Sequence, residues 1–351
     1  MTARFDVGIL GATGTVGQEL IGALAGHPWF RVGWIGASER SVGKRYAVAT
    51  PWRVAASRPD DIAEMTVEEC VPGTAPVLVF SGLDSSVAGE VERTFAVAGH
   101  TVVSNAKNHR MDIDVPLVIP EVNAEHLQLL EEQARMRRWK GKIVTNPNCS
   151  TIVMALALAP LRQFGLTQVV VSTLQAVSGA GYPGVASLDI VGNILPHIDG
   201  EESKMESEAQ KIFGELVDRR VVPHDVIVSA QTTRVPVING HTALISVKFS
   251  SSPTATDIIQ AFRGFGGRPQ SERLPTAPRQ PVCYLDDPDR PQPKLDVDRE
   301  GGMAVTVGRL RECPVLDYKF IALGHNTIRG AAGAAILNAE LMKVDGFLGE
   351  A

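Results

Sequence analysis

The order of apolar and polar positions along the chain changes near residue 150. Before that point, short uninterrupted apolar runs alternate with segments whose apolar residues recur at helical spacing. Such runs are typical of strands buried on both faces of a parallel sheet. The runs lie at residues 5–10, 30–35, 77–80, 101–104 and 143–146, and helical spacing covers 16–25 and 87–98. This β-α alternation predicts an α/β fold that begins with a Rossmann-like doubly wound sheet.

The second half of the chain has a different pattern. Residues 244–249 alternate apolar and polar positions, and residues 168–175, 303–310 and 318–323 also have the composition of strands. Residues 205–220 predict an amphipathic helix, whereas residues 266–293 are rich in Pro and Gly and predict a surface segment with little regular structure. An Ala-rich helix is expected at 328–344. We therefore expect a second domain of α+β type.

Length and composition agree with two domains. The 351 residues correspond to roughly two domains at about 150 residues each. The 34 basic and 39 acidic residues give a net charge of −5, which argues against a nucleic-acid surface or a polybasic membrane anchor. The longest uncharged apolar stretch, residues 150–161, is shorter than the roughly 20 residues of a membrane span. Since the N-terminus also lacks the features of a signal peptide, we expect a cytoplasmic protein.

The four cysteines, at positions 70, 149, 283 and 313, are too far apart for a metal knuckle or a dense disulfide framework. We therefore expect no metal site and a reducing compartment. Cys149 differs from the other three because a predicted buried strand precedes it and an apolar helix follows it. A helix N-terminus favours the thiolate, which is the nucleophilic form. Cys149 is thus a candidate nucleophile, although a small core residue is the other interpretation.

The first predicted strand runs directly into the glycine-rich segment GATGTVG, which opens a helix. This arrangement is typical of a dinucleotide-binding turn. The residues that we expect to contact the cofactor here are Gly11, Thr13, Gly14, Thr15, Val16 and Gly17. After the second strand, Ser38, Arg40 and Ser41 could surround a 2′-phosphate, whereas Glu39 would favour NAD if it turned inward. We favour NADP.

Candidate partners for a cysteine nucleophile occur in three later segments. Gln175 ends a predicted strand before a Gly/Ser loop, containing Ser178 and Gly179, that suits the close approach of a ligand. Glu201 and Lys204 are one helical turn apart and can share a face. Arg234 and His241 stand on either side of a Pro and a Gly. Because such residues are more often structural when taken singly, these segments alone leave the site open.

Seven segments in a fixed order resemble the aspartate-semialdehyde dehydrogenase family, in its archaeal and fungal branch. They are GATGTVG, SNAKNHR (104–110), NPNCST (146–151), LQAVSGAGYPG (174–184), GEESKMESE (200–208), RVPVINGHT (234–242) and GHNTIRGAAGAAILNAE (324–340). The resemblance spans nearly the whole chain. It implies an NADP-binding domain of residues 1–148 and 326–351, a catalytic and dimerisation domain of residues 149–325, and a homodimer or homotetramer.

Carried over residue by residue, the resemblance implies a role for each matching position. The implied activity is NADPH-dependent conversion of L-aspartyl 4-phosphate into L-aspartate 4-semialdehyde through a cysteine thioester, in the biosynthesis of lysine, threonine and methionine. The implied roles are Cys149 as nucleophile, His241 as acid and base, Gln175 positioning the intermediate, Arg234 holding the α-carboxylate, Glu201 or Glu202 holding the α-amino group, Lys204 and Arg110 binding phosphate with Asn105 nearby, Asn326 contacting the nicotinamide carboxamide, and the segment from Ser81 to Asp84 lining the cofactor.

Two other functions stay open at this point. A malonyl-CoA reductase of the same superfamily would use the same cysteine and NADPH but would have no α-amino group to hold. A non-catalytic NADP-binding regulator would keep the glycine-rich turn without needing Cys149, His241 and Arg234. The Glu, Lys and Arg set favours the amino-acid substrate.

Overall fold

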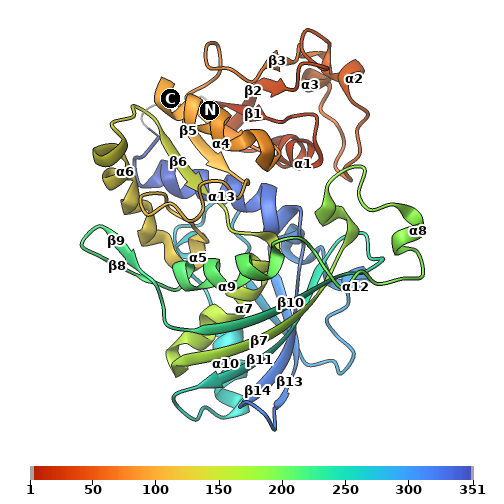
Figure 1. Ribbon diagram of the computed structural model, residues 1–351, viewed down its shortest axis with the longest axis vertical. Coiled ribbons are helices and arrows are strands. Elements are labelled where there is room, and N and C mark those ends of the chain that lie inside the picture. Colours follow the sequence, from red (N-terminus) through yellow and green to blue (C-terminus); the bar gives the residue numbers. More distant parts are fainter. Residues whose placement is uncertain (1–3, 349–351) are drawn as a thin grey trace.

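The computed structural model describes residues 4–348, which form two lobes, one above the other in Figure 1. The upper lobe is built on a six-stranded sheet in which every neighbouring pair of strands is parallel. Its strand order is β3-β2-β1-β4-β5-β6, the order of doubly wound dinucleotide-binding sheets. The strands are β1 (Phe5–Leu10), β2 (Phe30–Ala37), β3 (Glu68–Glu69), β4 (Leu78–Ser81), β5 (Thr101–Ser104) and β6 (Lys142–Thr145). The Rossmann-like prediction is confirmed.

Helices connect these strands. They are α1 (Thr15–Leu24), α2 (Tyr46–Ala49), α3 (Asp60–Glu64), α4 (Ser85–Ala98), α5 (Pro120–Asn123) and α6 (Leu129–Arg137). Helix α4 shows how local chemistry sets the bounds: the Asp84 carboxylate accepts the Ser86 N–H at its start, and Gly99 ends it in the left-handed conformation. Every residue of β4 and β5 is buried, which explains their uninterrupted apolar runs.

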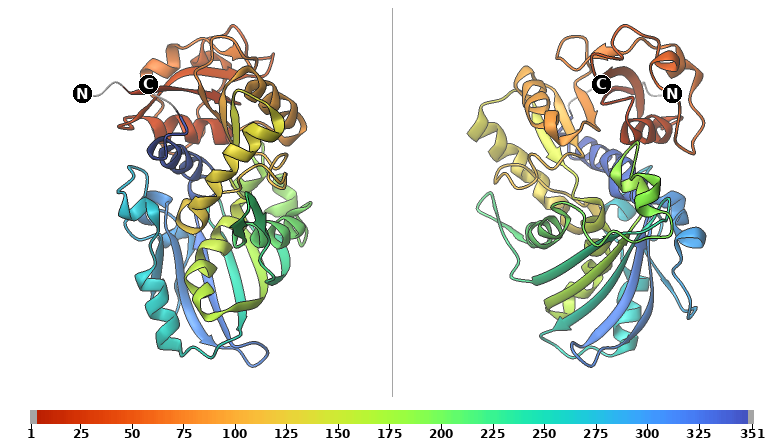
Figure 2. Two further views of the ribbon diagram at one scale, coloured as in Figure 1. Left: turned by 90° about the vertical axis from the view of Figure 1, so that its left-hand side faces the viewer. Right: turned by 45° about the vertical axis from the view of Figure 1, so that its right-hand side comes forward.

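The lower lobe contains a mixed sheet of order β10-β7-β11-β14-β13-β12, which Figure 2 shows in two further views. Its strands are β7 (Leu166–Gln175), β10 (Ile227–Arg234), β11 (His241–Phe249), β12 (Val282–Leu285), β13 (Val305–Glu312) and β14 (Tyr318–Gly324). Helices α7 (Cys149–Leu158) and α10 (Ala255–Gly264) share an apolar core with one face of this sheet. On the opposite face, Val170, Leu174 and Leu244 are exposed. The expected α+β domain is therefore present.

One prediction for this lobe was wrong, and a second holds only in part. Helix α9 occupies Glu201–Ile212, and residues 213–220 are not helical, because the chain turns back into a hairpin of β8 (Glu215–Val217) and β9 (Arg220–Val222). A side chain at Gly214 would place its Cβ 2.5 Å from the Val222 carbonyl oxygen, so this glycine permits the turn. The Pro- and Gly-rich segment is not irregular throughout either. It contains α11 (Arg268–Ser271) and β12, which adds a parallel edge strand to β13.

The last helix of the described residues returns to the upper lobe. A π-helical turn (Ile328–Ala332) leads into α13 (Gly333–Val344), which matches the predicted helix and lies between the lobes in Figure 1. Helix α13 packs on α1 and β5, and the Asn338 amide donates hydrogen bonds to the Val118 carbonyl and to Asn146 Oδ1. The domain boundaries drawn from the sequence stay a prediction. Two further short α-helices are α8 (Ser187–Ile190) and α12 (Pro293–Asp296). Among residues 4–348, no helix has both the length and the apolar character needed to cross a membrane.

Candidate active site

A cavity of about 540 Å³ is lined by residues of both lobes. Thr13, Gly14, Thr15 and Val16 line one part of it, at the start of α1. Cys149 lines another part, at the start of α7. The predicted site residues Asn105, Arg110, Ser178, Gly179 and Asn326 also line this cavity. The structure therefore brings the glycine-rich turn and the candidate nucleophile to one cavity of a size typical for ligand binding.

The start of α1 suits an anionic ligand. Gly14 precedes this helix, and no side chain of residues 4–348 caps its first N–H groups. Gly11 has φ +76°, and a Cβ there would lie 2.8 Å from the Gly82 carbonyl oxygen, while a Cβ at Gly17 would lie 2.4 Å from the Gly11 oxygen. Gly11 and Gly17 thus shape the turn, whereas Thr13 to Val16 face the cavity. Free N–H groups at a helix N-terminus are the donors that a pyrophosphate requires.

Besides Gly11 and Gly17, two further groups of predicted cofactor residues do not line the cavity. Ser38 and Arg40 are exposed and Ser41 is buried, in a turn closed by a bond from the Ser41 N–H to the Ser38 carbonyl. The Ser81 side chain is fully buried in the sheet, while the following residues Gly82, Leu83 and Asp84 line the cavity. Contacts from these serines and from Arg40 to a cofactor stay predictions.

Cys149 and His241 form a close pair. Cys149 is the first residue of α7, and the Asn148 carboxamide caps this helix by accepting the Ser150 and Thr151 N–H groups. The Cys149 sulfur lies 3.3 Å from His241 Nε2. His241 opens β11, and its Nδ1 accepts the Ala176 N–H at 3.1 Å.

The charge state of Cys149 differs from the sequence-based expectation. Desolvation of the thiol inside the site, and then the Glu201 carboxylate, raise its pKa to about 12, whereas Arg110, Arg234 and the Ser150 N–H act in the opposite direction. The Ser150 N–H at the helix N-terminus does favour the thiolate, as expected, but larger contributions outweigh it in the free site. Desolvation therefore outweighs the helix terminus and favours the thiol form of Cys149 in the free site.

His241 is neutral in the same arrangement. Burial, followed by the positive charge of Arg234, lowers the pKa of the imidazole to about 3. Since Nδ1 accepts a backbone N–H, the hydrogen of the neutral ring is on Nε2, which faces the Cys149 sulfur. His241 is thus a hydrogen-bond donor to the sulfur in the free site. The acid and base role expected from the resemblance requires the Ala176 bond to break first, and it stays a prediction.

The two candidate glutamates point to different partners. Glu201 is buried and accepts hydrogen bonds from the Asn148 amide at 2.9 Å, from Lys204 Nζ at 2.9 Å and from the Gln175 amide at 3.4 Å. Glu202 instead accepts the Thr232 N–H on β10 at 3.0 Å. Of the two, Glu201 is the one gathered with Gln175, Lys204 and the cap of the Cys149 helix.

Arg234 and Asn326 both hold the loop that follows β7. Arg234 is buried, and its Nη1 donates to the Ala176 carbonyl at 2.8 Å. The Asn326 amide donates to Ser178 Oγ at 2.8 Å, and its oxygen accepts the Gly240 N–H at 2.9 Å. The loop between Gln175 and Gly181 is therefore fixed against the start of β11, where His241 lies.

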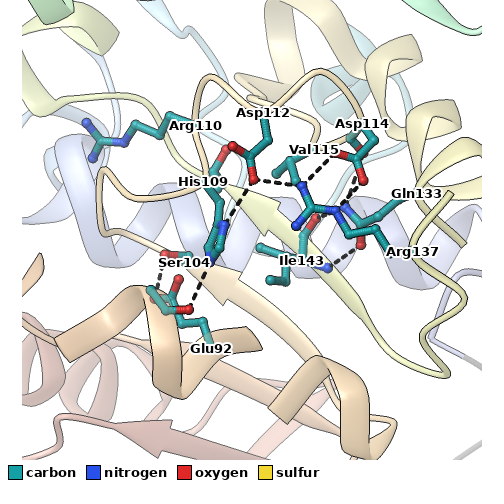
Figure 3. Close-up of polar contacts among 12 residues, drawn as sticks. Glu92, Ser104, His109, Arg110, Asp112, Asp114, Val115, Gln133, Arg137 and Ile143 are labelled. Carbon is teal, nitrogen blue, oxygen red and sulfur yellow. Dashed lines mark hydrogen bonds and ion pairs between the residues drawn. The ribbon is translucent and has the colours of Figure 1, made fainter. Parts of the chain in front are cut away.

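Arg110 belongs to a loop that is anchored at several points. Its guanidinium donates to Glu208 Oε1 at 2.9 Å and to the Asn105 carbonyl at 2.7 Å. Behind it, Asp112 accepts from His109 at 3.1 Å and from Arg137 at 2.7 Å. Figure 3 shows the Arg110 side chain pointing away from this His109–Asp112–Arg137 cluster.

Several residues of this site were missed by sequence reasoning. Asn148, Glu208 and Gly330 lie inside segments that carry the family resemblance, so those segments could have singled them out. A Cβ at Gly330 would lie 2.6 Å from the Cβ of Cys149, so any larger residue here would displace Cys149. Arg53 and Tyr182 also line the cavity and stack on each other at 3.7 Å. Tyr182 lies in the resembling segment 174–184, whereas no motif in the sequence signalled Arg53. Within the described range 4–348, no group of three or more His, Cys, Asp or Glu residues is arranged to hold a metal ion.

Comparison with family models and curated proteins identifies related sequences over nearly the whole chain. Residues 6–130 match the semialdehyde dehydrogenase NAD-binding domain, and residues 158–329 match the semialdehyde dehydrogenase dimerisation domain. An aspartate-semialdehyde dehydrogenase of Archaeoglobus fulgidus is 50% identical over 340 residues, which cover 97% of this chain and 98% of that protein. The Schizosaccharomyces pombe enzyme of the same name is 47% identical over 353 residues, covering 97% and 99% of the two chains.

Solved structures agree with these relatives. The crystal structure of aspartate semialdehyde dehydrogenase with NADP from Candida albicans has a TM-score of 0.91 and 43% identity, over 98% of this chain and 99% of that chain. Aspartate semialdehyde dehydrogenase II of Vibrio cholerae, complexed with ASA, has a TM-score of 0.78 and 26% identity at the same coverage. On this likeness in sequence, domain content and fold, the chain belongs to the aspartate-semialdehyde dehydrogenase family.

Proposed function

We propose that the protein catalyses the NADPH-dependent reductive dephosphorylation of L-aspartyl 4-phosphate to L-aspartate 4-semialdehyde. The observation that carries the proposal is the Cys149–His241 pair, with the sulfur 3.3 Å from Nε2. Cys149 lines the cavity that the glycine-rich turn also lines. The proposal is supported by two relatives named aspartate-semialdehyde dehydrogenase, whose alignments each cover 97% of this chain. The product is a precursor of lysine, threonine and methionine, which places the enzyme in amino-acid biosynthesis.

The charged side chains of the site match the charges of this substrate. Arg234 would hold the α-carboxylate, since its planar guanidinium suits a bidentate contact. Glu201 would hold the α-amino group, and Lys204 and Arg110 would hold the phosphate. Arg110 Nε has no hydrogen-bond partner among the described residues, which supports a contact to a bound anion. Gln175, bonded to Glu201, would position the acyl group.

The covalent step uses Cys149 as the nucleophile. Its sulfur attacks the acyl carbon, a carbon–sulfur bond forms and the carbon–oxygen bond to phosphate breaks, which leaves a thioester on the enzyme. Thioester formation from a thiol releases one proton, and the departing phosphate takes up one. The step therefore needs no net gain or loss of protons. This balance agrees with a Cys149 pKa of about 12.

Release of the product returns the sulfur to its starting state. When bound in the cavity, NADPH supplies the hydride that reduces the thioester carbonyl carbon. The resulting tetrahedral oxyanion on Cys149 collapses, the carbon–sulfur bond breaks, and the aldehyde leaves. His241 Nε2–H, 3.3 Å from the sulfur, stabilises the thiolate until it takes up a proton from solvent.

The cavity residues suit NADP as the cofactor. Thr13 to Val16 would hold the pyrophosphate at the uncapped start of α1. Ser178, Gly179 and Asn326, which line the cavity near the start of β11, would surround the nicotinamide. Arg40 with Ser38 and Ser41 would hold the 2′-phosphate. The related Candida albicans protein was solved with NADP.

We further propose that the open face of the mixed sheet is covered by a second copy of the chain. Val170 and Leu174 on β7 and Leu244 on β11 are exposed side by side on this face, within the residues that match a dimerisation domain. Leu244→Lys should convert a dimer into monomers in sedimentation, while Val48→Lys, at an exposed position of the upper lobe, should not. The four free cysteines support a cytoplasmic location for this oligomer.

The activity is tested by phosphate-dependent reduction of NADP in the presence of L-aspartate 4-semialdehyde, repeated with NAD. We expect turnover that requires phosphate and prefers NADP. A parallel assay of NADPH oxidation with malonyl-CoA tests the other reductase. Turnover with malonyl-CoA and none with aspartate semialdehyde would replace the proposed substrate. Absence of both would favour a regulator that binds NADP without chemistry.

A further inference from the structure

Helix α9 presents four charged side chains along one side. Glu201, Lys204, Glu208 and Lys211 are spaced so that they share a face of the helix. Glu201 and Lys204 were expected at the substrate from the sequence. Glu208 was not expected there, yet it is at least as buried as Glu201, with 2% of its surface exposed against 7%. A buried carboxylate requires strong partners.

Glu208 uses each of its two oxygens for a different partner. Oε1 accepts a hydrogen bond from Arg110 Nη1 at 2.9 Å, and Oε2 accepts the backbone N–H of Asn148 at 2.7 Å. Asn148 immediately precedes Cys149 and caps its helix. One carboxylate therefore connects the cation proposed to hold phosphate with the chain segment that carries the nucleophile.

The other contacts of Arg110 leave its guanidinium dependent on Glu208. Nη2 donates to the Asn105 carbonyl at 2.7 Å, and among the described residues Glu208 is the side chain that hydrogen-bonds the guanidinium. The backbone of this loop is fixed separately, because Lys211 Nζ donates to the carbonyls of Arg110, Asp112 and Val115 at 2.7, 2.7 and 2.8 Å. Figure 3 shows that the cluster behind the loop does not reach the Arg110 side chain.

We infer that Glu208 is a positioning residue that fixes the Arg110 guanidinium relative to the Cys149 sulfur, an inference that rests on the proposed phosphate-binding role of Arg110. Arg110 must hold the phosphate while the Cys149 sulfur attacks the acyl carbon next to it. If either the guanidinium or the sulfur is displaced, the substrate can no longer meet both at once. Glu208 couples them because it bonds both partners at once. It touches neither substrate nor cofactor in this role.

The test is Glu208→Gln, assayed for phosphate-dependent reduction of NADP. Glutamine has one acceptor oxygen and no charge, so Arg110 loses either its acceptor or the charge of that acceptor, and is held less firmly in both arrangements. Because hydrogen bonds to charged groups are strong, we expect the KM for phosphate to rise roughly tenfold or more. The KM for NADP should change less than twofold. The matched control is Glu206→Gln on the same helix, whose acceptor role toward the Ala230 N–H glutamine retains, and its kinetics should equal those of the parent enzyme.

A double-mutant cycle separates this inference from the role of Arg110 itself. If Glu208 acts through Arg110, then Glu208→Gln should change the KM for phosphate less than twofold in an Arg110→Gln background. Additive effects of the two substitutions, or an unchanged KM in Glu208→Gln alone, would overturn the inference. An unchanged KM in Arg110→Gln alone would instead remove the proposed phosphate contact.

A folding defect is distinguished by NADP affinity and by thermal unfolding. Should Glu208→Gln fail to fold, Glu208→Asp keeps both oxygens and the charge but shortens the side chain by one methylene. This variant should also raise the KM for phosphate selectively, by a smaller factor than Glu208→Gln is expected to show. A folded Glu208→Asp with the KM of the parent enzyme would contradict the inference.

Discussion

The surroundings of Cys149 and the end of β2 are both candidate binding regions, but they are built differently. Around Cys149, the side chains of Arg110, Glu201, Arg234 and His241 are buried and each is hydrogen-bonded to another part of the chain. At the end of β2, Ser38 and Arg40 are exposed to solvent. The fold thus pre-organises the chemical region before any ligand arrives. Changes there should alter turnover by large factors, whereas changes after β2 should alter only cofactor affinity.

The largest expected effect is that of Cys149→Ala. Removal of the sulfur removes the covalent route, so kcat should fall at least about ten-thousandfold, as when a nucleophile is deleted in other covalent enzymes. The Kd for NADP should stay within about a factor of two, because the turn that begins α1 is untouched. The measurements are steady-state kinetics and a direct titration with NADP. Retention of more than a hundredth of the parent activity would contradict the nucleophile assignment.

The second effect compares two cysteines of the same chain under alkylation. Desolvation raises the Cys149 pKa to about 12, so its thiolate fraction, and its rate with iodoacetamide, should increase about tenfold per pH unit between pH 7 and 10. The Leu316 N–H bond lowers the pKa of Cys313 below its usual range, so the rate at Cys313 should level off within that interval. Site-resolved mass spectrometry measures both rates in one sample. A plateau for Cys149 below pH 8 would restore the thiolate expected from the helix N-terminus.

The same contrast explains what the sequence could predict. The parallel sheet followed from uninterrupted apolar runs, and the glycine-rich turn and the helix after Cys149 followed from adjacent residues. These features depend on local order along the chain. The hairpin after α9 was missed because it depends on the fit of Gly214 against Val222, which no periodicity signals.

The properties of the site that were missed depend on contacts between distant segments. The raised pKa of Cys149 arises from burial and from Glu201 on another helix, and the state of His241 depends on the Ala176 N–H after β7. The bond between Glu208 and Arg110 likewise joins α9 to the loop after β5. Residue types and motifs identified the members of the site, but only the folded arrangement assigns their protons and partners.

The third effect is that of Arg234→Lys. The ammonium group is a point charge and loses the planar pair of donors, and it also leaves the Ala176 carbonyl without its 2.8 Å partner. We expect kcat/KM for aspartate semialdehyde to fall roughly a hundredfold, since bidentate charged contacts are strong. The control is Arg31→Lys, at an exposed ion pair with Asp6 in the upper lobe, which should leave the kinetics unchanged. Equal kcat/KM in Arg234→Lys and the parent enzyme would argue against the carboxylate contact.

The smallest expected effect is that of Arg40→Ala, at the exposed end of β2. The Arg40 side chain is solvated before the ligand binds, so its contact with the 2′-phosphate gains only the free energy of a charge attraction screened by water and salt. We therefore expect the preference for NADP over NAD to fall about tenfold at low salt. The kcat should not change, since the residues proposed to surround the nicotinamide, Ser178, Gly179 and Asn326, belong to other segments and are fixed by their own hydrogen bonds. Arg45→Ala, which removes an exposed partner of Glu64, is the control for general loss of positive charge. If Arg40→Ala keeps the full preference, the 2′-phosphate must be recognised by residues that the fold already holds in place. The contrast between an ordered chemical region and an adaptable cofactor region would then fail.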